Sequence, residues 1–170
     1  FSALHRERKD VLISLNLDTA VLDSGAAGSN YLIKQVEKWG VAPHNVIIEI
    51  LESQVTNEDE LMHFVSTYRE HGFLIGMDDV GVGHSNLERI ARIRPDVVKM
   101  DRSLVSMIDQ EFYKREVASA LIKLSGQLGA LCLAEGVERV EEASLLLELG
   151  VDVFQGYFFA RPGELGAEED

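Results

Sequence analysis

The stretch FLIGMDDVGVGHSNLERIARIRPDVVKMD, residues 73–101, decides the fold class of this chain. It begins with the apolar run Phe73–Asp78, typical of a buried β-strand, and passes through a glycine-containing loop into a helical pattern over Leu87–Ile93. Pro95 ends that helix, and a second strand-like run follows over Val97–Met100. Two strands joined by a helix in this way predict a parallel βαβ unit.

The same alternation extends from this unit in both directions along the chain. Strands are expected at Val11–Leu17, Val46–Leu51, Phe73–Asp78, Val97–Met100, Leu131–Ala134 and Val151–Phe154. Helices are expected at Tyr31–Trp39, from Thr56 to Gly72, at Leu87–Ile93, at about Phe112–Leu128 and at Val140–Leu149. Strands that alternate with helices in this regular way predict an α/β fold of the (β/α)-barrel type.

Each expected strand ends in an acid, an amide or a pair of a lysine and an acid. These residues are Asn16, Glu49 with Glu52, Asp78 with Asp79, Lys99 with Asp101, Glu135, and Gln155. In a barrel the carboxyl ends of parallel strands lie on one face, so these side chains would converge there. Oxygen ligands favour magnesium or manganese, and the five histidines have no spacing typical of a zinc site. The sequence therefore predicts a site for divalent cations.

The doublet Asp78-Asp79 has two interpretations. Most such doublets are turn or capping residues. Adjacent carboxylates repel each other, however, and a divalent cation favours their ionisation. Gly81 and Gly83 follow, and they allow the backbone to approach a ligand closely or to move as a lid. His84, in the same loop, is a candidate ligand contact.

The other polar residues at strand ends also leave alternatives open. Lys99 and Asp101 are two residues apart on one expected strand, so they should point to the same side, either as an ion pair or as a water-positioning lysine beside metal-bound carboxylates. Glu135 is a metal ligand, a general base or a helix-capping acid. Glu49 lies inside an apolar run, where a charge needs a partner or a metal. Asn16 is notable because it has the same strand position as the acids.

Composition excludes several function classes. The formal net charge of −13 argues against binding to nucleic acid polymers or anionic lipid, and a phosphate-ester substrate would need bound cations. Cys132 is the only cysteine, so no intrachain disulfide can form, and we expect a buried thiol in a reducing cytoplasm. No apolar run is long enough to span a bilayer, and no signal-peptide pattern is present at the N-terminus.

Six segments, taken in order, resemble the EAL family of cyclic di-GMP phosphodiesterases. They are LISLNLD, EILES, DDVGVGHSN, KMDRSLV, AEGVE and QGYFFARP. The resemblance implies metal ligation by Asn16, Glu49, Asp78, Asp79 and Asp101. It implies that Lys99 helps to position the attacking water and that Glu135 is the general base or a ligand close to it. It also implies that Glu52 anchors the glycine loop and that Gln155 lies at or just behind the substrate.

The implied activity is hydrolysis of one phosphodiester bond of cyclic di-GMP, which gives linear pGpG. Two magnesium or manganese ions would hold the phosphate and supply hydroxide. The resemblance also implies a homodimer in the bacterial cytoplasm, with a neighbouring sensory or GGDEF-type domain in the full-length protein.

Two departures from the family pattern are visible. The Glu-Ala-Leu motif is absent, and so are the opening two strands, so the resemblance implies an incomplete TIM-type barrel of about six of the eight strands. That domain would occupy residues 1–163, followed by an acidic, disordered tail at 164–170, and we expect this chain alone to be weakly active or inactive. In the glycine loop, Val80, Val82, His84 and Asn86 stand where the family usually has Phe, Thr, Tyr and Ser.

The altered loop motivates a second hypothesis, an impaired EAL-like domain that acts as a cyclic di-GMP receptor or regulatory scaffold. A third hypothesis is an enolizing metal enzyme that uses Lys99 as its base. It fits the acids at the strand ends but not the segments around Glu135 and Gln155.

Overall fold

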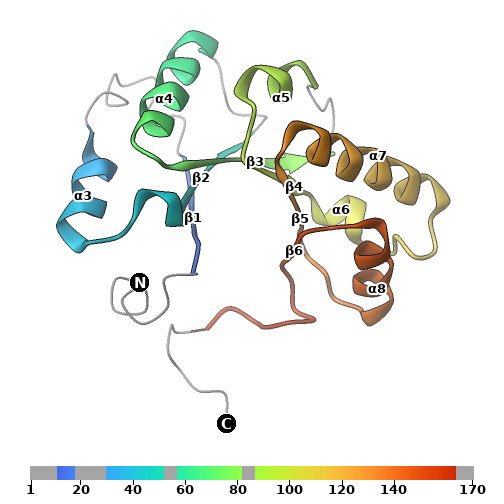
Figure 1. Ribbon diagram of the computed structural model, residues 1–170. Coiled ribbons are helices and arrows are strands. Elements are labelled where there is room, and N and C mark those ends of the chain that lie inside the picture. Colours follow the sequence, from blue (N-terminus) through green and yellow to red (C-terminus); the bar gives the residue numbers. More distant parts are fainter. Residues whose placement is uncertain (1–10, 18–29, 52–56, 82–86, 164–170) are drawn as a thin grey trace. The chain divides into compact units, whose positions relative to one another are not determined.

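The computed structural model describes residues 11–17, 30–51, 57–81 and 87–163. The chain divides into two compact units, residues 1–75 with 162–170 and residues 76–161. We call them unit 1 and unit 2. Strands alternate with helices along both units, as the colours of Figure 1 show. This alternation is the one that the sequence predicts.

Unit 1 contains a pair of parallel strands. Strand β1 (Ile13–Asn16) pairs with β2 (Val46–Leu51), and the register places Asn16 opposite Glu49. Helix α3 (Tyr31–Trp39) and a short 3₁₀ helix (Pro43–Asn45) lie between these strands in sequence. Strand β2 is buried on both faces, as strands of parallel sheets are, although it carries Glu49 among its apolar residues.

Helix α4 (Glu58–Glu70) follows β2 and buries an aromatic face. The ring centroids of Phe64 and Tyr68 lie 4.3 Å apart, and Phe73 meets Tyr68 edge to face at 5.2 Å. The helix begins at Glu58, two residues later than the expected start at Thr56. Its N-cap is therefore Asn57, whose side chain accepts a hydrogen bond from the N–H of Glu60 at 3.2 Å. Thr56 itself lies outside the described residues.

The strands of unit 2 form a parallel sheet in sequence order. They are the Gly76–Val80 part of β3 (Leu74–Val80), then β4 (Val97–Met100), β5 (Leu131–Ala134) and β6 (Val153–Phe154). The central strand β4 is buried throughout. Because all four strands run in the same direction, the residues that follow them gather at one edge of this sheet.

The helices of unit 2 are α5 (Leu87–Ile93), α6 (Arg102–Val105), α7 (Phe112–Leu128) and α8 (Val140–Leu149). Helix α7 packs against β4 and β5 and contacts α6. The short helix α6 is not among the helices expected from the sequence. It forms because the side chain of Asp101 caps its first turn and accepts a hydrogen bond from the N–H of Ser103 at 2.8 Å.

The expected burial of the Cys132 thiol is confirmed. Cys132 is fully buried in β5, and burial raises the pKa of its thiol to about 11, as expected for an unreactive cysteine.

Among the described helices, none combines the length and the hydrophobicity needed to cross a bilayer.

Candidate active site

The two adjacent aspartates lie in a β-bulge at the carboxyl end of β3. Met77 pairs with Val98 and Val80 pairs with Met100, so Asp78 and Asp79 together face only one residue of β4. In a regular strand their side chains would point to opposite faces of the sheet. The extra residue breaks this alternation. As a result, both carboxylates are available to one site.

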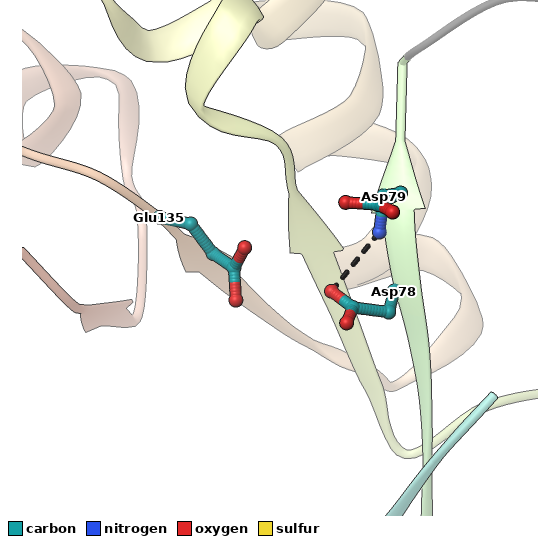
Figure 2. Close-up of side chains that lie close together, drawn as sticks. All are labelled: Asp78, Asp79 and Glu135. Atoms are coloured by element: carbon teal, nitrogen blue, oxygen red, sulfur yellow. Dashed lines mark hydrogen bonds between the residues drawn. The ribbon is translucent and has the colours of Figure 1, made fainter. Parts of the chain in front are cut away.

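The backbone at Asp79 completes the bulge. Its φ is +56°, in the left-handed region that Asp and Asn tolerate better than most residues. Its N–H donates a hydrogen bond to Oδ1 of Asp78 at 3.0 Å. Figure 2 shows the two carboxylates beside that of Glu135, which directly follows β5. One oxygen from each of these three residues lies within 4.8 Å of the others.

Lys99 of β4 lies between the flanking strand ends. Its Nζ is 3.0 Å from Oδ1 of Asp78 and 2.6 Å from Oε1 of Glu135. The lysine is only 5% exposed, so these are ion pairs shielded from water. Buried charges persist when they are paired in this manner. The ammonium therefore fixes the separation of the two carboxylates.

The charges of this cluster, which consists of Asp78, Asp79, Lys99 and Glu135, do not cancel. One ammonium faces three carboxylates, which leaves two negative charges. Burial raises the pKa of Asp79, the charges of Asp78 and Asp101 raise it further, and the charge of Lys99 lowers it. A divalent cation would match the excess charge, and three carboxylate oxygens are suitable ligands for a hard cation such as Mg²⁺ or Mn²⁺. The residues present thus fit a metal of this class.

Asp101 has a different position from the one expected. Strand β4 ends at Met100, and Asp101 is the N-cap of α6 rather than a strand residue two positions beyond Lys99. Its Oδ1 accepts a hydrogen bond from the N–H of Ser103, as described above. Its charge nevertheless acts on Asp79, so it belongs to the electrostatic surroundings of the cluster. Metal ligation by Asp101 stays a prediction.

A pocket of about 240 Å³ adjoins the cluster. It is lined by Arg102, Glu135, Gly136, Glu138, Gln155, Gly156 and Tyr157. Glu135 thus belongs to both the cluster and the pocket. The exposed Gln155 lies where β6 ends, and Arg102 pairs with Glu138 at 2.9 Å. The pocket offers hydrogen-bonding groups and an aromatic ring to a ligand next to the acidic cluster.

Two glycines make this pocket possible. A Cβ on Gly136, whose φ is +65°, would lie 2.5 Å from Cγ of Arg102. A Cβ on Gly156 would overlap the backbone of Val137. The loops after β5 and β6 therefore approach each other closely because neither glycine carries a side chain.

In unit 1, Asn16 and Glu49 are brought together by strand register. They are direct partners in the β1–β2 pair. Glu49 is 4% exposed, whereas Asn16 is exposed. Their predicted role as metal ligands stays a prediction. Glu52, Gly83 and His84 were also expected at the site, and they lie outside the described residues.

Sequence reasoning missed several residues that shape the site. Arg102 lines the pocket, and the buried Glu142 of α8 holds the loop that begins at Glu135. A signal for Glu142 was present in the sequence. It is an acid at the third position of α8, the position of the acidic residue in a capping box, with Arg139 as the N-cap. For Arg102, the only signal in the sequence was its position next to Asp101.

Comparison with known proteins gives consistent matches. A family model described as EAL domain matches residues 1–162. Among curated relatives, the probable cyclic di-GMP phosphodiesterase PdeA of Escherichia coli is 30% identical over 161 residues, which is 94% of this chain and 22% of PdeA. The chain therefore spans about a fifth of the length of this relative.

Solved structures agree. Klebsiella pneumoniae BlrP1 in a manganese and cyclic di-GMP complex has a TM-score of 0.86 at 30% identity, covering 95% of this chain and 42% of that one. Bacillus subtilis YkuI with cyclic di-GMP and calcium has a TM-score of 0.80 at 31% identity, covering 95% and 40%. With the six parallel strands described, these matches confirm the expected fold class, an incomplete TIM-type (β/α) barrel. The chain belongs to the EAL domain family.

Proposed function

We propose that this chain is the catalytic part of a metal-dependent cyclic di-GMP phosphodiesterase. The observation that carries the proposal is the cluster of three carboxylates and the buried Lys99 next to a pocket. The family match and the relatives named above support it.

The proposed reaction is hydrolysis of one phosphodiester bond. The oxygen of a water molecule forms a bond to phosphorus, the bond from phosphorus to the 3′ oxygen breaks, and that oxygen takes up a proton. The product is linear pGpG, which keeps its 5′ phosphate. Two ions of Mg²⁺ or Mn²⁺ would lower the pKa of the attacking water and neutralise the phosphate.

The residues of the chain have separate roles in this proposal. Asp78 and Asp79 hold the metal, together with Asn16, Glu49 and Asp101. Glu135 accepts the proton of the attacking water, and the ammonium of Lys99 keeps Glu135 and Asp78 in place. Gln155 binds the substrate in the pocket that it lines with Glu135.

The test uses the full-length protein that contains this chain. It is incubated with cyclic di-GMP and Mn²⁺ or Mg²⁺, and pGpG is measured by chromatography. We expect turnover that needs the metal and is lost in Asp78→Asn. Glu148→Gln, an exposed substitution on α8, serves as the control and should leave turnover unchanged. Absence of pGpG with every metal would refute the catalytic proposal.

The same preparation tests the receptor hypothesis. Calorimetry with Ca²⁺ in place of the active metal measures binding of cyclic di-GMP directly. Binding without turnover in Mn²⁺ would favour a receptor or scaffold, the second hypothesis. Turnover would exclude a purely receptor role.

We further infer that the full-length protein is a homodimer in the bacterial cytoplasm and carries a sensory or GGDEF-type domain beside this one. The fraction of PdeA and of YkuI that the chain covers supports the presence of other domains. We also propose that the EAL-type domain ends at residue 163, before the tail 164–170. Light scattering of the full-length protein would measure its oligomeric state.

A further inference from the structure

The loop after β5, residues 135–139, is held by its own backbone N–H groups. The N–H of Glu135 donates to the carbonyl of Met100 at 3.1 Å, and the N–H of Val137 donates to the carbonyl of Gln155 at 3.1 Å. Two further hydrogen bonds from this loop go to a side chain. The N–H groups of Glu138 and Arg139 both donate to Oε2 of Glu142 at 3.1 Å.

Glu142 also contacts a second segment. It is 2% exposed, and its other oxygen, Oε1, accepts a hydrogen bond from the N–H of Met107 at 2.9 Å. Met107 lies in the turn 106–111 between α6 and α7. One buried carboxylate therefore joins this turn to the loop 135–139. Each of the two oxygens acts only as an acceptor in these contacts.

An ion pair joins the same two segments a second time. Arg139 binds Asp109 with both ends of its guanidinium, Nη1 to Oδ1 at 3.0 Å and Nη2 to Oδ2 at 3.2 Å. The turn is held in addition by α7, since Nζ of Lys114 donates to the carbonyl of Ser106 at 2.7 Å. The loop is thus attached to a fixed turn.

We propose that Glu142 is a positioning residue that keeps Glu135 against Lys99. This inference rests on the proposed function for the role of Glu135. Glu135 begins the loop that Glu142 holds, and its Oε1 must stay 2.6 Å from Nζ of Lys99. The loop is also held between these two points, because Gly136 lies against the side chain of Arg102 and the N–H of Val137 donates to the carbonyl of Gln155. A shift of the backbone at residues 138–139 is therefore transmitted to the carboxylate.

Glutamine cannot replace Glu142 in this network. It has the same shape but only one acceptor oxygen. Whichever way its amide is turned, an NH₂ group faces either the N–H of Met107 or the two N–H groups of Glu138 and Arg139. Glu142→Gln therefore loosens the loop without removing a side chain from the core.

The first measurement is hydrogen exchange in the full-length protein. In Glu142→Gln we expect the amides of residues 138–139 to exchange about tenfold faster, while β5 and the middle of α8 keep their protection. Glu148→Gln on the same helix makes the same chemical change at an exposed position and should alter neither. An even rise in exchange over the whole of unit 2 would show a merely structural role and overturn the inference.

The second measurement is Mn²⁺ binding by calorimetry, together with kcat and KM for cyclic di-GMP. Glu135 is one of the three carboxylates whose oxygens fit a divalent cation, and residues that orient such carboxylates typically change metal affinity 10- to 100-fold when replaced. We expect at least tenfold weaker Mn²⁺ binding and a fall in kcat larger than any rise in KM. Asp109→Asn should have a smaller effect in the same direction, because it loosens the side chain of Arg139 and leaves the backbone contacts intact.

These measurements separate the two proposals. If the wild-type protein makes no pGpG, the proposed function fails, and hydrogen exchange with Mn²⁺ binding still decides the role of Glu142. If the wild type is active and Glu142→Gln has unchanged Mn²⁺ affinity and kcat, the inference about Glu142 fails by itself.

Discussion

Both units have polar residues at the ends of their strands, but the surroundings of these residues differ. In unit 1, Asn16 and Glu49 lie side by side because β1 and β2 pair in register. In unit 2, Asp78, Lys99 and Glu135 come from three successive strand ends and are joined by two ion pairs. A polar residue at a strand end can therefore contribute to the stability of the fold through ion pairs, or it can lie at the surface and contribute little. Substitutions in the cluster of unit 2 should change stability and activity together, whereas Asn16 should affect activity alone.

The largest effect is expected for Lys99→Ala. It leaves Asp78 and Glu135 partly buried without the ammonium between them. Removing one partner of a buried pair costs about 3–5 kcal/mol in the free energy of unfolding. We also expect kcat to fall about 1000-fold, because Glu135 loses its position. Urea unfolding and pGpG production measure the two effects.

Two variants sharpen this experiment. Lys99→Met keeps the aliphatic stem and should recover part of the stability but none of the activity. Lys38→Ala, on α3 of unit 1, removes a lysine that lies over the ring of Trp39 at 5.0 Å and should leave activity unchanged. Near-normal turnover in Lys99→Ala would mean that the lysine is only a structural ion-pair partner.

Asn16→Ala tests the other side of the comparison. Because Asn16 is exposed at the end of β1, we expect the free energy of unfolding without metal to change by less than about 0.5 kcal/mol. If its amide is a ligand, kcat at limiting Mn²⁺ should fall about 10- to 100-fold. Ser14→Ala, exposed two residues earlier on the same strand, is the matched control. Equal activities of the two variants would remove Asn16 from the ligand set.

Asp79→Asn should stabilise the protein without metal. It removes a charge whose pKa is raised by burial and by the neighbouring carboxylates, and asparagine tolerates φ of +56° well. We expect a melting temperature above that of the wild type in the absence of metal, because the repulsion among the carboxylates is reduced. The rise in melting temperature that Mn²⁺ gives the wild type should be lost. Melting curves with and without Mn²⁺ measure this, with the exposed substitution Glu116→Gln as control. A lower melting temperature without metal would contradict the explanation.

The smallest effect concerns pH and Asp109. Partial burial raises the pKa of Asp109, but the hydrogen bonds and charge of Arg139 outweigh it and hold the pKa below its usual range. A lowered pKa stabilises the folded state above the usual carboxyl pKa of about 4, and this contribution is lost as the pH falls through the folded-state value. The wild type should therefore melt above Asp109→Asn at pH 7, and the difference should shrink toward pH 3. A difference that does not depend on pH would rule out the ion pair as its cause.

The sequence determined the order and the class of the elements. Apolar runs of strand length, helical periodicity and the glycines that end helices reflect local energetics, so six strands and their helices could be placed from the residues. The same runs showed that Asp78, Lys99 and Glu135 would follow strands, and the segments around them indicated the EAL family that the comparison confirms. The predicted ends of the elements were less accurate. In the structure Asn57 is the N-cap of α4, and Asp101 is the N-cap of α6.

The tertiary structure decided how these residues meet. The bulge that turns both Asp78 and Asp79 toward one site depends on pairing between β3 and β4, which no local pattern specifies. Lys99 separates Asp78 from Glu135 only because β4 lies between β3 and β5. Glu142 acts on a turn 35 residues away in sequence. Such contacts depend on distances between chain segments that are far apart in sequence, and these distances are set by the packing of the sheet and its helices.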